Sequence, residues 1–269
     1  MRKQMRRSAF WMKERMLHRQ TRARLDELDR SQWQSREELA KIQLRKLQGV
    51  VSHAWDTVPL YRARLEGIGF EPGDLKSLDD LVKLPVVTKE DLRSNRDGIV
   101  SSLPGGRLTS VRTSGSTGQP LVLTIGARAK AWHLANQLRG RAWWGLGVGE
   151  EEIRLWGDTR GLGAGYRVGL GRLAKRAKDH LVGVTPLSAF AISIQDLRRY
   201  CKLLAQRRPQ ILFGYGTALW ALAEYITDAE ISFDAWHPRV VVYTAETLHP
   251  EQKTLMTKAF GAPVVCEYG

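Results

Sequence analysis

The residues best suited to chemistry in this sequence form one short run, Thr113-Ser114-Gly115-Ser116-Thr117-Gly118. Its glycines let the backbone turn so that successive N–H groups converge, and its hydroxyls add further hydrogen-bond donors. A loop of this kind can hold a phosphate group. The alternative is a polar hairpin connection, because β-leaning residues lie on both sides, at 108–112 and 121–124. The run is not a Walker A loop, because it lacks the Gly-Lys-Ser/Thr ending of that motif.

A second group of candidate residues follows three apolar runs at 211–213, 240–243 and 264–266. Each run has the composition of a strand that is covered on both faces. Helical patterns separate the runs, and crossovers of that length predict parallel pairing. Parallel strands end at the same edge, which is where α/β sheets bind ligands. We therefore expect one crevice to be lined by Gly214, Tyr215, Gly216, Ala245, Glu246, Tyr268 and Gly269.

Capping signals predict the helices that position these residues. Ser35 and Glu38 form a capping box ahead of an apolar face with helical spacing, and Val58-Pro59 ends that helix. Thr88 is the expected N-cap of a short helix with acidic residues in its first turn. Thr217 is expected to cap the helix after 211–213, and a further helix is expected from Ala127 to Trp144.

Length and composition limit the class of protein. The chain has 269 residues, of which 43% are hydrophobic, so it can bury the core of one large α/β domain or of two small ones. Cys201 and Cys266 lie far apart without neighbouring histidines, which argues against a zinc site and against a disulfide framework. No apolar run reaches the length of a membrane span, and the basic start lacks the apolar segment of a secretory signal. We expect a cytoplasmic protein.

The net charge of +14 suggests an anionic partner. Residues 1–48 alone carry 14 Lys and Arg against 6 Asp and Glu, a net charge of +8. This predicts a basic helical arm at 1–34, with weak contact to an anionic membrane surface as one use for it. A binding module for anionic polymers or membranes is therefore the alternative to an enzyme. No zinc-finger, RNP or basic-zipper pattern is present, so we expect no nucleic-acid partner.

The glycines at 161–169 do not make a dinucleotide fingerprint, because their spacing is wrong and no acidic residue ends a second strand about twenty residues on. We interpret 157–171 as a loop followed by a basic helix that carries Arg172, Lys175, Arg176 and Lys178. His133 lies alone within the helix at 127–144 and is assigned no role.

Six segments of the chain resemble the adenylate-forming (AMP-binding) superfamily, in its phenylacetate–CoA ligase-like and capsular polysaccharide biosynthesis branch. In chain order the segments are 56–62, 84–93, 114–120, 208–219, 244–248 and 268–269. The run Ser114-Gly115-Ser116-Thr117-Gly118-Gln119-Pro120 is similar to the phosphate loop of the family, and Thr244-Ala245-Glu246-Thr247-Leu248 is similar to its adenine-contacting turn. Thr244 departs from the usual glycine or serine of that turn. Tyr268-Gly269 is similar to the start of the YG-x-x-E motif.

The resemblance implies an α/β fold with mixed and parallel sheets and flanking helices. It implies an incomplete N-terminal AMP-binding domain at 35–269 behind the arm at 1–34, with the C-terminal domain absent. The glutamate of YG-x-x-E, which binds Mg²⁺ in the family, would lie beyond Gly269. We therefore expect neither a metal ligand nor a complete catalytic apparatus in this chain, and we expect the chain by itself to show no adenylation turnover.

The implied activity joins a small carboxylic acid to ATP, with Mg²⁺, as an acyl adenylate and then transfers the acyl group to coenzyme A. Aryl acetates, fatty acids and sugar-linked carboxylates all fit such a scaffold. The implied nucleotide-binding residues are Thr113, Ser114, Gly115, Ser116, Thr117, Gly118, Ala245, Glu246, Thr247, Tyr268 and Gly269. Gly214 and Tyr215 are the implied acyl-binding residues, and a core role is the alternative for Tyr215.

Overall fold

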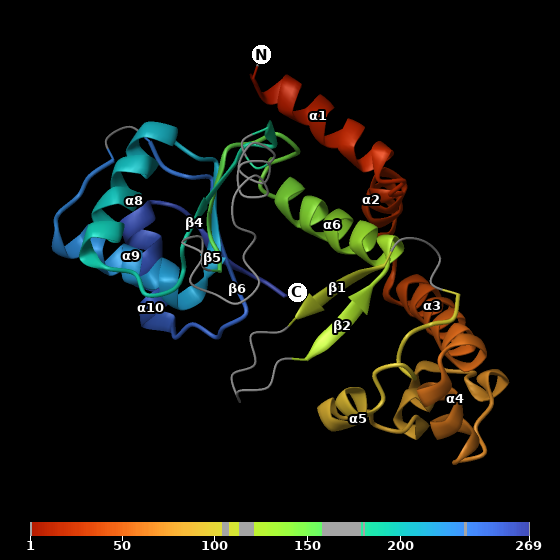
Figure 1. Ribbon diagram of the computed structural model, residues 1–269. Helices are drawn as coiled ribbons and strands as arrows, with labels where there is room; N and C mark the ends of the chain where they lie inside the picture. Colours follow the sequence, from red (N-terminus) through yellow and green to blue (C-terminus); the bar gives the residue numbers. More distant parts are fainter. Residues whose placement is uncertain are drawn as a thin grey trace. The chain divides into compact units, whose positions relative to one another are not determined.

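The computed structural model describes residues 2–103, 108–112, 121–157, 179, 181–233 and 236–268. The chain divides into two compact units (Figure 1). Unit 1 comprises residues 1–16 and 137–269, and unit 2 comprises residues 17–136. Helix α6 (Ala127–Ala142) contributes its first ten residues to unit 2 and its last six to unit 1. Within the described ranges, no helix combines the length and the apolar composition needed to cross a membrane.

Unit 1 is built on a five-stranded parallel sheet with the order β4-β3-β5-β6-β7. The strands are β3 (Glu152–Leu155), β4 (Val184–Leu187), β5 (Ile211–Tyr215), β6 (Val240–Thr244) and β7 (Val264–Glu267). The last three confirm the predicted strands and their parallel pairing. Strands β3 and β4 were not predicted, because each has only four residues and neither is continuously apolar.

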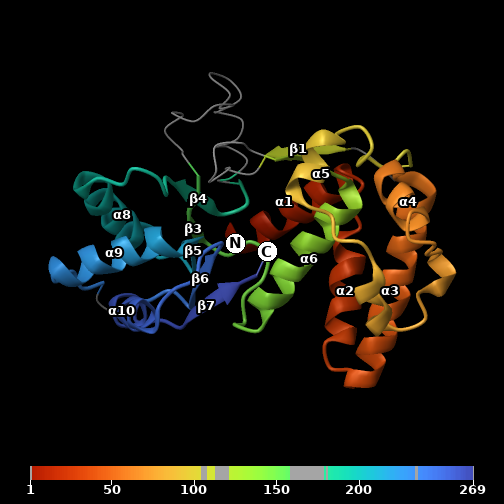
Figure 2. The same ribbon diagram turned by 90° about the horizontal axis from the view of Figure 1, so that it is seen from below.

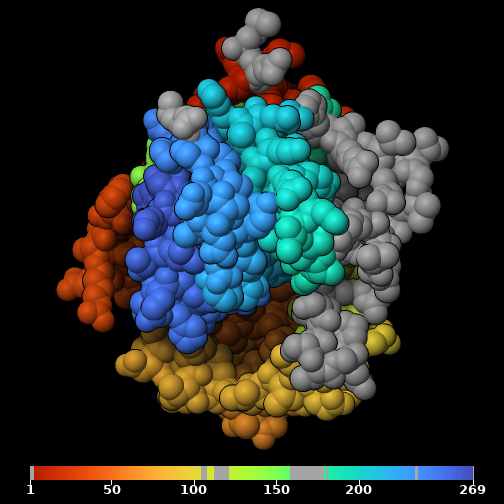
Figure 3. Space-filling model, turned by 90° about the vertical axis from the view of Figure 1, so that its left-hand side faces the viewer, coloured from red at the N-terminus to blue at the C-terminus, as the bar shows by residue number. Residues whose placement is uncertain are grey.

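Three helices cover one face of this sheet: α8 (Ile194–Arg207), α9 (Gly216–Asp228) and α10 (Pro250–Phe260). Figure 3 looks onto these helices, which lie next to one another. The main core of unit 1 lies between them and the sheet. Its fully buried members include Leu155, Leu212, Leu222, Val241 and Met256. Gly261 ends α10 in a left-handed conformation, with a positive φ of 61°.

The other face of the sheet carries a smaller apolar cluster and a buried ion group. Phe213 and Val242 belong to the cluster. In the ion group the Glu152 carboxylate lies 2.9 Å from Arg141 and 2.6 Å from Arg154, and its side chain is only 2% exposed. Burial by itself would raise the pKa of Glu152, but the two positive charges outweigh burial and lower that pKa below its ordinary value.

The first helix, α1 (Arg2–Met16), also belongs to unit 1. Lys3 pairs with Glu150 at 2.5 Å, and Arg6 pairs with Glu151. The basic segment predicted at 1–34 is thus helical, but it forms two helices, α1 and α2 (Thr21–Ser31). His18, with a φ of 50°, lies between them.

Unit 2 holds most of the remaining helices, and Figure 2 shows α2 and α3 side by side. Its elements are α2, α3 (Arg36–Thr57), α4 (Pro59–Glu66), η1 (Pro72–Asp74), η2 (Leu78–Lys83), α5 (Lys89–Ser94), β1 (Thr109–Arg112) and β2 (Val122–Ile125). Val51, Leu65, Phe70 and Leu75 form a small core. The capping box predicted at Ser35 is present, and Thr88 is the N-cap of α5 as predicted, in a capping box completed by Asp91. Strands β1 and β2 pair antiparallel, which confirms the β-leaning runs on both sides of 113–120.

We predict that Glu152→Gln lowers the free energy of unfolding by about 3–5 kcal/mol, because it leaves two arginines without their shared buried partner. Urea titration measures this loss, and Glu66→Gln, which removes an exposed pair with Arg62, is the matched control with no measurable change. Because the folded pKa of Glu152 is lowered, its stabilisation is present above the pKa of a free glutamate, about 4.3. It is lost as the pH falls through the folded pKa.

The difference in free energy of unfolding between wild type and Glu152→Gln should therefore shrink in strong acid. A difference that stays unchanged there would contradict this assignment.

Candidate functional site

The carboxyl ends of the parallel strands form one edge of unit 1. The register pairs Tyr215 with Thr244, and Thr244 with Glu267. The turns that follow β5, β6 and β7 therefore begin side by side. The structure thus brings the predicted residues Gly214, Tyr215, Ala245, Glu246 and Tyr268 to the same edge of the sheet.

Glu246 joins the turn after β6 to the helix after β5. Its Oε2 accepts the backbone N–H of Thr217 at 2.6 Å, and its Oε1 accepts the Thr217 hydroxyl at 3.1 Å. Unpaired N–H groups and the helix dipole both favour a carboxylate at the start of a helix. This corrects the expectation that Thr217 is the N-cap. Helix α9 begins at Gly216 with Tyr215 as its N-cap residue, and the cap is supplied by a side chain distant in sequence.

Backbone geometry supports the same contact. Ala245 has a φ of 68°, a conformation that L-residues rarely adopt, and it turns the chain at the end of β6. At Gly216, a Cβ would lie 2.9 Å from the Leu248 side chain and 3.2 Å from the Glu246 carboxylate. A side chain at position 216 would therefore push against the residues that cap α9.

Tyr215 lies within a group of aromatic side chains at this edge. Its ring stacks on Trp156 with centroids 4.4 Å apart and an interplanar angle of 9°. The centroid of the Phe190 ring lies 5.7 Å from that of Tyr215. Burial, and then the charge of Glu246, raise the pKa of the Tyr215 hydroxyl. Trp156 and Phe190 remain 41% and 48% exposed, so the group offers aromatic surface to a ligand.

Sequence reasoning missed Trp156 and Phe190 because it missed the strands that precede them. Trp156 directly follows β3, and Phe190 follows β4 by three residues. Gly214 shows how closely β3 and β5 approach, because a Cβ there would lie 2.7 Å from the Leu155 carbonyl oxygen. That contact is to backbone, so the glycine is required by packing between the strands.

The last strand ends in a second polar contact. The side-chain amide of Gln137, in α6, donates to Glu267 Oε1 at 2.7 Å. The next residue, Tyr268, is fully exposed, and Thr247 is exposed as well.

The two cysteines differ in exposure. Cys266 in β7 is exposed, whereas Cys201 is buried, and burial raises the pKa of the Cys201 thiol to about 11.

Several predicted site residues lie outside the described part of the chain. These are Thr113, Ser114, Gly115, Ser116, Thr117, Gly118 and Gly269. The glycines at 161–169 and the basic residues Arg172, Lys175, Arg176 and Lys178 also lie outside it. Among the residues that are described, no three His, Cys, Asp or Glu side chains gather where a metal ion could bind.

Comparison with known proteins gives the family. No family model matches the chain. The chain is 38% identical over 259 residues to a phenylacetate-coenzyme A ligase of Pseudomonas putida, a match that covers 94% of this chain and 55% of the relative. It is also 27% identical over 191 residues to protein CapK of Staphylococcus aureus, covering 69% of this chain and 40% of CapK.

A solved structure agrees with these relatives. The fold is similar to 2-hydroxyisobutyryl-CoA ligase in complex with 2-HIB-AMP and CoA, with a TM-score of 0.63 and 25% identity over 86% of this chain and 49% of that one. The chain belongs to the adenylate-forming superfamily. It spans about half the length of the Pseudomonas ligase and of this structure.

Within this chain, the edge of unit 1 offers two kinds of interaction. Tyr268, Trp156 and Phe190 present aromatic surface to solvent. The carboxylate of Glu246 is directed at Thr217 and holds the turn, which leaves the backbone of 245–247 as the part of this segment that is free to contact a ligand.

We predict that Glu246→Ala lowers the free energy of unfolding by about 1–2 kcal/mol, because the first-turn amide of Thr217 loses its acceptor. Glu246→Gln retains an acceptor oxygen and is expected to lose less than half of that amount. Chemical denaturation of the three proteins measures both effects. Equal losses in the two variants would show that charge alone, and not the hydrogen bond, maintains the turn.

Proposed function

We propose that the whole protein activates a small carboxylic acid with ATP and transfers the acyl group to coenzyme A. The support is the match to a phenylacetate-coenzyme A ligase along 94% of this chain and the similarity in fold to a ligase that binds 2-HIB-AMP and CoA. The observation that carries the proposal to particular residues is the convergence of Tyr215, Glu246 and Tyr268 at the carboxyl edge of one parallel sheet.

The reaction has two steps. A carboxylate oxygen of the acid attacks the α-phosphorus of ATP, which forms the mixed anhydride as the bond to pyrophosphate breaks. The thiolate of coenzyme A then attacks the acyl carbon, and AMP leaves. In both steps the protein positions the reactants and stabilises charge, and it forms no covalent bond to them.

We assign the binding roles as follows. The loop at 113–118 would hold the β- and γ-phosphates through its N–H groups and hydroxyls. The backbone of 245–247, the ring of Tyr268 and Gly269 would hold the adenosine. Gly214 and Tyr215 would border the acyl group. Magnesium would accompany the triphosphate, and the described residues contain no group of ligands for it.

The aromatic group at the edge favours an aromatic acid. Trp156 and Phe190 both contact Tyr215 and remain partly exposed, so a flat ring beside them would bury apolar surface and stack. A long aliphatic chain would gain burial but not stacking. We therefore propose an aryl acid, such as phenylacetate, as the substrate class.

The alternative function, an anionic-surface module that uses the basic N-terminal residues, receives less support. Lys3 and Arg6 of α1 pair with Glu150 and Glu151 of the same unit, so part of the positive charge is already neutralised within the protein. The phenylacetate-coenzyme A ligase of Pseudomonas putida matches the chain well beyond the basic segment, over 259 residues.

The test is calorimetric binding of a phenylacetyl-adenylate analogue that carries a non-hydrolysable sulfamoyl linkage. Tyr268→Ala should weaken binding about fivefold or more, because a base–aromatic stack is worth roughly 1–3 kcal/mol. Lys3→Gln, at an exposed lysine of α1, should leave binding unchanged. An anionic-surface module would reverse this pattern, with no affinity for the analogue and with binding to heparin that falls steeply with salt and depends on Lys3.

A second prediction tests the substrate class. Trp156→Ala should weaken binding of the phenylacetyl analogue about three- to tenfold, since an aromatic pair contributes roughly 0.5–1.5 kcal/mol beyond its buried area. The same substitution should change binding of an acetyl-adenylate analogue by less than about twofold, because the smaller acyl group does not reach the stack. Equal losses for both analogues would exclude the aromatic group as the acyl-selective surface.

A further inference from the structure

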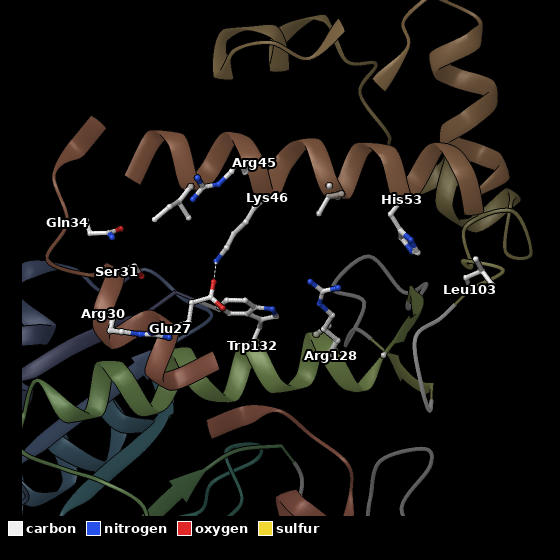
Figure 4. A pocket seen from close by; sticks show the side chains of 15 residues that line it. Glu27, Arg30, Ser31, Gln34, Arg45, Lys46, His53, Leu103, Arg128 and Trp132 are labelled. Carbon is white, nitrogen blue, oxygen red and sulfur yellow. Dashed lines mark ion pairs between the residues drawn. The ribbon is translucent and has the colours of Figure 1, made fainter. Parts of the chain in front are cut away.

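Unit 2 contains a large open groove that the proposed reaction does not use. Its volume is about 1030 Å³, at or above the upper end of small-molecule pockets, roughly 1,000 Å³. Figure 4 shows α3 on one side of it and α2 and α6 on the other. All the residues that line it belong to unit 2.

The spacing of the lining residues along α3 identifies the shape that the groove would accept. They are Ile42, Arg45, Lys46, Gly49, Val50 and His53. This is the i, i+3, i+4, i+7 pattern of one helix face, and it extends over about 16 Å. This face of α3 is three turns long and lies across the groove from α2 and α6. The space between them has the length that a further helix would occupy. Such a groove suits an α-helix of similar length.

Gly49 provides an independent observation. It lies in the middle of α3, a 22-residue helix, where glycine costs about 1 kcal/mol relative to alanine. A Cβ at this position would meet nothing within 4 Å, so nothing within the described chain requires the glycine. A small residue at the centre of an exposed helix face allows the backbone of another helix to approach closely.

The charges of the groove specify the partner helix. Four cationic side chains line it, Arg30, Arg45, Lys46 and Arg128, against the single carboxylate of Glu27. Lys46 pairs with Glu27 at 2.9 Å and lies 4.1 Å from the ring centroid of Trp132. Arg45 and Arg128 form no ion pair with any residue that the structure describes. In Figure 4 they lie on opposite walls of the groove.

Apolar residues lie between these cations. Ile42, Val50, Ala129 and the half-buried Trp132 supply surface that an apolar ridge of a helix would cover. A simple polyanion would use the cations but would leave this surface exposed. A second copy of the chain is also a poor fit, because each copy carries a net charge of +14.

We propose that this groove binds an acidic amphipathic helix of a partner protein, with the small and apolar residues of that helix packed over Gly49 and its glutamates or aspartates paired with Arg45 and Arg128. The proposal is independent of the ligase activity, since none of these residues belongs to the carboxyl edge of unit 1.

The experiment measures fluorescence polarisation of a labelled, stapled 15-residue helix titrated with the 269-residue chain. The peptide carries Leu and Ala along one face and Glu on both flanks, and a matched peptide carries Lys in place of every Glu. We expect the Glu peptide to bind at least about tenfold more tightly. The double variant Arg45→Glu, Arg128→Glu should lose at least about tenfold in affinity. Lys41→Glu, an exposed position on α3 outside the groove, should lose less than about twofold.

Two substitutions at Gly49 distinguish an effect on folding from an effect on peptide binding. Gly49→Ala and Gly49→Gln should both raise the melting temperature, because each improves helix propensity at a position where a side chain meets nothing. Only Gly49→Gln should weaken binding of the Glu peptide, by about fivefold or more, since the glutamine side chain fills the place where the two helices would approach most closely. A more stable protein that has lost binding cannot be explained by misfolding.

Several outcomes would overturn the proposal. The two peptides could bind equally, or Lys41→Glu could reduce the affinity as much as the double variant Arg45→Glu, Arg128→Glu does. Gly49→Gln could leave peptide binding intact while heparin or phosphatidylserine vesicles depend on Arg45 and Arg128, which would make the groove a polyanion site. Sedimentation could instead show self-association that Arg45→Glu abolishes, which would make the occupant a second copy.

Discussion

The parallel pairing of β5 with β3 on one side and β6 on the other is the constraint on which the candidate site depends. It places Tyr215 level with Thr244, and so the turn that begins α9 lies beside the turn that follows β6. Gly214 permits this arrangement, because the Leu155 carbonyl leaves no room for a side chain. Glu246 then fixes the two turns to one another through Thr217. The edge is therefore held by strand packing and by one carboxylate, and the exposed side chain of Tyr268 takes no part in holding it.

Much of unit 1 could be predicted from sequence because its signals are local and strong. The runs at 211–213 and 240–243 are apolar, and Pro250 and Gly261 mark the ends of a helix. Once the crossovers require parallel strands, the alignment of the turns follows without any knowledge of the family. The capping box at Ser35 and the N-cap at Thr88 were predictable for the same reason, since both depend on residues within one helical turn.

The features that sequence reasoning missed depend on contacts between distant residues. The stack of Trp156 on Tyr215 requires β3 to lie beside β5, and β3 carries Glu152 and Arg154 in place of apolar residues. The Glu152 carboxylate is buried beside Arg154 of the same strand and Arg141 of α6, a different element. The N-cap of α9 was assigned to Thr217 because a hydroxyl at the start of a helix is a common signal, whereas the actual acceptor comes from 29 residues further along the chain.

The two cysteines give the protein a practical property. Cys201 is buried and its thiol stays protonated near neutral pH, whereas Cys266 is exposed in β7, two residues before Tyr268. Thiolate character and access together decide which cysteine a maleimide modifies. A fluorophore attached to the native protein would therefore label one position, at the end of the sheet where the nucleoside is proposed to bind, and would report occupancy there without any engineered residue.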